Sequence, residues 1–116
     1  MRKTLSIILL FCSIIFLLST CKKKNEFKHL DCSKIDSKYS TAIKSIISSN
    51  CTLSGCHDGS SSASNLTTYD KVKPFVDNGQ FNEQVIKTKA MPQNRSLSQD
   101  ERNKIKCWLD DGGPNN

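Results

Sequence analysis

The chain has 116 residues, of which 36% are hydrophobic and 24% charged, a composition typical of one small globular domain and not of a disordered or collagen-like chain. Most of its net charge of +6 lies before residue 30, since the remainder holds 11 basic and 10 acidic residues with the two signs interspersed. The folded part therefore has no basic face for phosphate groups, which excludes a nucleic-acid-binding protein.

The first twenty residues have the pattern of an export signal. Two basic residues precede an almost entirely apolar run at 5–18, which is shorter than the ~20 residues of a membrane-spanning helix. The run ends in LSTC at residues 18–21, which resembles the lipobox of bacterial lipoproteins, whose cysteine is acylated and becomes the mature N-terminus. We therefore expect a lipoprotein signal peptide at 1–20, a lipid on Cys21 and a location on the periplasmic face of a bacterial membrane. The alternative is a plain signal or membrane anchor with an incidental cysteine.

Residues 21–36 are polar, rich in lysine and without a helical or strand period, so we interpret them as a lipidated N-terminus followed by a flexible tether. The folded domain is expected at 37–116. Removal of the signal and use of Cys21 for the lipid leave four cysteines, which are Cys32, Cys51, Cys56 and Cys107. An exported protein meets an oxidising compartment, and four cysteines allow three pairings.

The domain is expected to be all-α, because its apolar residues recur with helical spacing and none alternate with period two. A first helix should end near Asn50 and bury the stripe Tyr39, Ile43, Ile46 and Ile47. A second is expected from about 68 to 77, capped by Thr67 or Thr68 and stopped at 78–79. Pro74 predicts that this helix is shorter or bent.

Two further helices follow. Residues 81–88 are expected to form a short helix with its inward side made of Phe81, Val85 and Ile86. The last helix should begin with a capping box of Ser98 and Glu101 and end at the glycines 112–113. Its inward face is expected to carry Ile105, Trp108 and Leu109.

The loop after the first helix carries the sequence CTLSGCH at 51–57. In the usual signature for covalent haem attachment, C-x-x-C-H, two thiols add to the haem vinyl groups and the histidine ligates the iron. Here two extra residues follow Cys51, while Cys56 and His57 remain adjacent and Gly55 supplies backbone freedom. The pattern favours c-type haem over two alternatives. A zinc site would need a second pair of ligands, which this sequence lacks, and a plain disulfide would give His57 no role.

Met91 is the only methionine beyond the signal, and it lies in a polar loop directly before Pro92, which favours an extended backbone. In haems with His/Met ligation a thioether binds the iron opposite the histidine and raises the reduction potential. The alternative is a methionine that fills a gap in the core, but no helical period surrounds Met91.

Taken together, the C…CH loop, the sequence NLTTY at 65–69, the Met91-Pro92 pair and the segment 97–113 resemble the small class I c-type cytochromes of exported bacterial proteins. The resemblance covers about residues 39–113 and implies three to five helices around one covalently bound haem c, with the first and last helices crossing. It implies thioether bonds from Cys51 and Cys56 and iron ligation by His57 and Met91. The wider gap between the cysteines leaves attachment at both points open.

The same resemblance places Cys32 and Cys107 on elements that cross, so that the two could form a disulfide. A buried, unpaired Cys107 is the alternative. Trp108 is expected to be a core or haem-edge residue, Tyr69 and Phe75 to pack near the haem, and His29 to be a solvated residue of the tether.

The function implied is that of a monomeric electron carrier, not an enzyme, which is held at the membrane by its lipid and exchanges electrons with redox proteins. Two alternatives remain at this point. One is a sensor or enzyme in which a small ligand displaces Met91. The other is an interaction domain without haem, stapled by disulfides.

Overall fold

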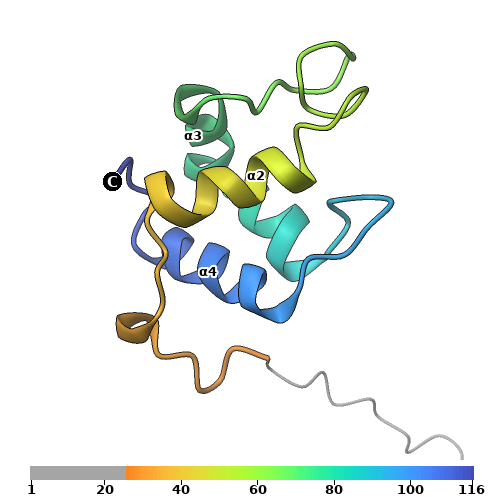
Figure 1. Ribbon diagram of the computed structural model, residues 1–116. Helices are drawn as coiled ribbons and strands as arrows, with labels where there is room; N and C mark the ends of the chain where they lie inside the picture. The colour runs from red at the N-terminus through yellow and green to blue at the C-terminus, as the bar shows by residue number, and fades with distance from the viewer. Residues whose placement is uncertain (1–25) are drawn as a thin grey trace, which may run out of the picture.

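The computed structural model describes residues 26–116, so the predicted signal peptide and the predicted lipid on Cys21 lie outside the described part. These residues form helices joined by loops, without a strand among them, and the predicted all-α class is confirmed (Figure 1). The elements in chain order are η1 (Cys32–Lys34), η2 (Tyr39–Ile43), α2 (Lys44–Asn50), α3 (Tyr69–Asp77), η3 (Asn82–Lys87) and α4 (Gln99–Asp110). Within residues 26–116 no helix has the length and hydropathy needed to cross a membrane.

The first predicted helix consists of η2 and α2, which follow each other without a break. The first turn of this helix has π-helical spacing, and the helix ends at Asn50, as predicted. Its buried residues include the whole predicted stripe, Tyr39, Ile43, Ile46 and Ile47. The 3.6-residue period of the apolar side chains therefore located the inward face correctly.

Helix α4 packs against the first helix in the opposite direction. Asn50, at the end of α2, donates from Nδ2 to Glu101 Oε1 at 3.1 Å near the start of α4. At the other end the Tyr39 ring lies 5.8 Å from the ring of Trp108. The capping box of Ser98 and Glu101 is present, so the start of α4 is as predicted.

Helix α3 begins after Thr68 and runs to Asp77 with Pro74 inside it. Of the two effects predicted for Pro74, a shorter or a bent helix, the shortening is not observed. Pro74 removes one N–H and leaves the carbonyl of Asp70 without a helical partner, but both residues are exposed and water can bind there. The next element, η3, buries Val85 and Ile86 and follows the buried Phe81, as predicted.

A disulfide joins Cys32 in η1 to Cys107 in α4, with 5.5 Å between their Cα atoms. Phe27 packs against the core, and Glu26 forms ion pairs with residues of the domain. Residues 26–36, which the sequence assigned to a flexible tether, are thus fastened to the domain.

Candidate functional site

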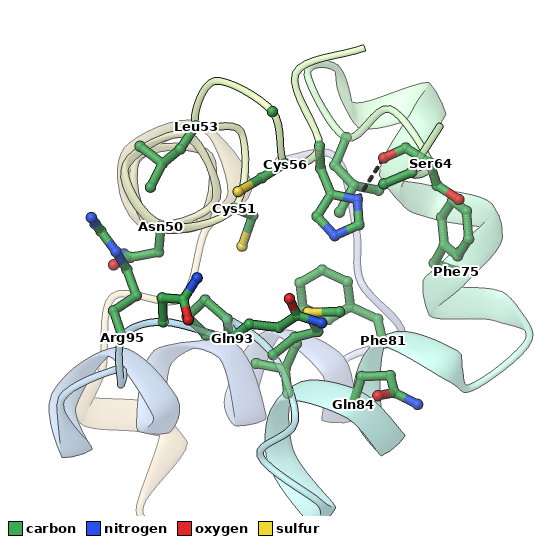
Figure 2. A pocket seen from close by; sticks show the side chains of 18 of the residues that line it. Asn50, Cys51, Leu53, Cys56, Ser64, Phe75, Phe81, Gln84, Gln93 and Arg95 are labelled. Atoms are coloured by element: carbon green, nitrogen blue, oxygen red, sulfur yellow. Dashed lines mark hydrogen bonds between the residues drawn. The ribbon is translucent and has the colours of Figure 1, made fainter. Parts of the chain in front are cut away.

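A cavity of about 470 Å³ lies between the loop that follows α2 and the loop that precedes α4 (Figure 2). Its volume is in the range of pockets that bind cofactors and small ligands. The lining includes the four residues that the sequence singled out, which are Cys51, Cys56, His57 and Met91. The fold brings these side chains, from two separate loops, to one cavity.

The loop that carries both cysteines closes on itself through its backbone. The N–H of His57 donates to the carbonyl of Cys51 at 3.1 Å, and the N–H of Cys56 donates to the carbonyl of Leu53 at 2.9 Å. Gly55 has φ +77°, which is a backbone conformation that side chains disfavour. The two extra residues are taken up in this turn, and Figure 2 shows Cys51 and Cys56 on the same side of the open space.

The two thiols differ in their surroundings. Neither is in a disulfide; Cys56 is exposed, whereas Cys51 is half-buried and packs against the core. Burial, with a smaller contribution from the nearby Cys56, raises the pKa of the Cys51 thiol to about 11. Cys51 is therefore protonated at neutral pH.

His57 is held by one hydrogen bond that fixes its tautomer. Its Nδ1 lies 2.6 Å from the carbonyl oxygen of Ser64, the bond drawn as a dashed line in Figure 2. A carbonyl oxygen only accepts, so Nδ1 carries a hydrogen, and in the neutral imidazole the free lone pair is therefore on Nε2. Histidines that ligate metals are commonly oriented by such a bond from the other ring nitrogen.

Met91 lies on the loop between η3 and α4. Its N–H donates to the carbonyl of Gln84 in η3 at 3.1 Å, and its half-buried side chain packs against the core. The polar residues Gln93, Asn94 and Arg95 of the same loop also line the cavity. Arg95 is in addition tied to the end of the first helix, because its Nη1 donates to the carbonyl of Ser49 at 3.0 Å.

The rest of the lining divides into an apolar and a polar part. Leu66, Phe75 and Phe81 supply apolar walls, and Figure 2 places Phe81 across the open space from the two cysteines. Asn50 and Gln84 supply amide groups. Of these, sequence analysis had associated only Phe75 with the site. Leu66 lies in the NLTTY sequence at 65–69, whereas no motif marks Asn50, Phe81 or Gln84 as site residues, and their place follows from the packing of the helices.

The remaining residues that the sequence discussed lie elsewhere. Trp108 is fully buried, as expected for a core residue, and donates from Nε1 to the carbonyl of Pro114 at 2.9 Å. Tyr69, expected near the haem, is not part of the cavity lining and donates its hydroxyl to the carbonyl of Gly113 at 2.8 Å. His29 is exposed.

Over residues 26–116, no three side chains of His, Cys, Asp or Glu gather into a metal site. Comparison of the chain with protein-family models, with curated proteins and with solved structures found no match.

Proposed function

We propose that this protein is a class I c-type cytochrome that holds one haem covalently and carries single electrons between redox proteins. The observation that carries the proposal is that Cys51, Cys56, His57 and Met91 line one cavity although the spacing of the cysteines departs from the usual signature. A structural cysteine pair would not need a histidine with a free Nε2 lone pair beside it, nor a thioether on a separate loop.

The residues present fit the group. In covalent attachment, each thiol adds across a vinyl double bond, so that sulfur binds one carbon and the thiol hydrogen goes to the other without an oxidant. Neither Cys51 nor Cys56 is in a disulfide, so both are available for this addition. The Cys51 thiol is protonated at neutral pH, and Cys56 is exposed. The apolar walls of the cavity suit a porphyrin face, and the amides and Arg95 suit its polar edge.

The chain would tune this group through its two iron ligands. When bound, haem supplies an iron atom that gains or loses one electron. The neutral thioether of Met91 favours Fe(II) and raises the reduction potential above that of a bis-histidine haem. The carbonyl of Ser64 keeps His57 in one tautomer and one orientation. If His57 and Met91 both held the iron, no position on it would be left for a substrate, and the chain would act as a carrier and not as an enzyme.

The surroundings of the site suit a protein partner that docks weakly. Among the described residues that line the cavity, Arg95 is the one with a charged Lys, Arg, Asp or Glu side chain. The sequence from residue 30 onward has a net charge of only +1. We expect docking through a small patch around the haem edge, with little dependence on salt concentration. A lipid on Cys21 would hold the carrier at the periplasmic face of the membrane.

The test is expression with a cytochrome c maturation system. The protein should keep its haem through denaturing electrophoresis, and its oxidised form should show the sulfur-to-iron charge-transfer band. Met91→Ala should abolish the band, lower the reduction potential and open the iron to carbon monoxide.

Three outcomes would contradict the proposal. Haem lost on denaturation refutes covalent attachment. A wild-type protein that lacks the band and binds carbon monoxide readily is a ligand-binding sensor or enzyme. A colourless protein supports the disulfide-stapled interaction domain.

A further inference from the structure

Met91 borders two cavities. Besides the cavity of about 470 Å³ it lines a separate one of about 60 Å³, to which Lys89 and Arg102 also contribute. A void of this size has room for a water molecule or for a shifted side chain. The direction of the Met91 thioether therefore depends on how firmly its loop is held.

The stretch of this loop just before Met91 has an unfavourable backbone. Lys89 has φ +55°, a left-handed conformation that residues other than glycine rarely adopt. Surrounding contacts must offset its conformational cost. Before Lys89 the chain belongs to η3, which ends at Lys87. After Lys89, the N–H of Met91 donates a hydrogen bond to the carbonyl of Gln84.

Glu26 supplies a contact from outside the loop. Its Oε2 lies 2.7 Å from Lys89 Nζ, and its Oε1 lies 3.6 Å from Arg102 Nε on α4. The side chains of Glu26 and Arg102 are only 25% and 17% exposed, so water and salt screen this pair less than a surface pair. Arg102 also donates from Nη1 to the carbonyl of Leu97, at the far end of the same loop. The Glu26 carboxylate thus links the start of the loop, at Lys89, to Arg102 on α4, and Arg102 itself holds the end of the loop at Leu97.

Glu26 is itself held in place. Phe27 packs against the hydrophobic core, and Cys32 is bonded to Cys107 in α4. We call residues 26–32 the strap. The strap is fixed at one end by the disulfide and reaches the Met91 loop with the other.

We propose that Glu26 is a positioning residue for Met91. By neutralising Lys89 and Arg102 at fixed distances, it keeps the loop in the conformation that directs the thioether to the larger cavity. Without it, the thioether has the smaller cavity to move into. The inference rests on the proposed function, in which the larger cavity is where Met91 meets the iron.

The test compares Glu26→Gln with Glu83→Gln. Both variants remove one negative charge and keep the side-chain shape, but Glu83 pairs with Lys87, at 3.1 Å, and is not part of the strap. Imidazole binds to the oxidised iron only after Met91 has left, so its rate of binding reports how often the thioether dissociates. We expect this rate to rise about fivefold in Glu26→Gln, the effect of one lost ion pair, and to stay at the wild-type value in Glu83→Gln. The charge-transfer band should weaken in Glu26→Gln alone.

Amide hydrogen exchange gives a second readout. The N–H of Met91, bonded to Gln84, should exchange about fivefold faster in Glu26→Gln, while that of Ile46 in α2 should not change. Equal behaviour of Glu26→Gln and Glu83→Gln in both measurements would overturn the inference and leave the proposed function intact. If the wild-type protein carries no haem, the proposed function fails, and the exchange measurement still decides whether the strap holds the Met91 loop.

Discussion

Removal of the Cys32–Cys107 disulfide should destabilise the domain strongly. The two cysteines are 75 residues apart, so the bond closes most of the described chain into one loop. In the chain-entropy model a loop of this length lowers the entropy of the unfolded state enough to stabilise the fold by about 4.5 kcal/mol at 25 °C. Small domains unfold at a cost of about 5–15 kcal/mol, so this bond supplies a large share of the stability.

The perturbation is Cys32→Ala, because Cys32 is exposed and its substitution leaves the core unchanged. Cys107 is only 2% exposed, so the double variant with Cys107→Ala adds a small cavity and should cost about 1 kcal/mol more. Urea unfolding followed by far-UV circular dichroism gives the free energy, and thermal unfolding should show a midpoint lowered by about 20–35 °C.

The control is the redox state of the wild-type protein. Alkylation without reduction, followed by mass spectrometry, should leave Cys32 and Cys107 unlabelled. The reasoning is refuted if the two residues are labelled, or if Cys32→Ala changes the free energy of unfolding by less than about 1 kcal/mol.

Three further predictions concern the site and its supports. Cys51→Ala should keep haem through denaturing electrophoresis by a single thioether, because Cys56 is adjacent to His57, the proposed iron ligand. Loss of haem would contradict this, and the pyridine haemochrome spectrum reports the number of thioethers. Gly59→Ala should destabilise the loop around the site by about 1–3 kcal/mol, because Gly59 has φ +91° and an added Cβ would meet the side chain of Asn65. Thermal unfolding measures this loss of stability, and an unchanged midpoint would contradict the prediction. The hydrogen bond from the backbone N–H of Ser98 lowers the pKa of Glu101 below its usual 4.5. The capping box therefore contributes stability above that pH and loses it as the pH falls through the lowered pKa. Glu101→Gln should flatten the dependence of the free energy of unfolding on pH in this range.

The sequence predicted those parts of the fold that depend on local patterns. The end of the first helix at Asn50 and the start of α4 at Ser98 follow from apolar period and capping chemistry, which act within a few residues. The residue types and their spacing also singled out four residues that line the cavity, Cys51, Cys56, His57 and Met91. For α3 the sequence predicted a helix shortened or bent by Pro74, and the shortening is not observed, because the carbonyl left free by the missing N–H is exposed to water.

The contacts that hold the site could not be predicted in the same way. Ser64 orients His57 through a carbonyl that every residue possesses, so no side-chain pattern marks it. Glu26 meets Lys89 across 63 positions of sequence, and an ion pair at that separation has no local signal. Both depend on how the loops pack once the helices have formed.

The attachment of residues 26–36 to the domain changes how the protein would meet its partners at a membrane. Five peptide units separate Cys21 from Glu26, and a fully extended chain spans at most about 3.6 Å per residue. A lipid on Cys21 would therefore keep Glu26 within about 18 Å of the bilayer surface. The proposed carrier, held that closely, would search for its partners by lateral diffusion, in two dimensions. It would exchange electrons with those whose own redox centres lie near the same membrane plane.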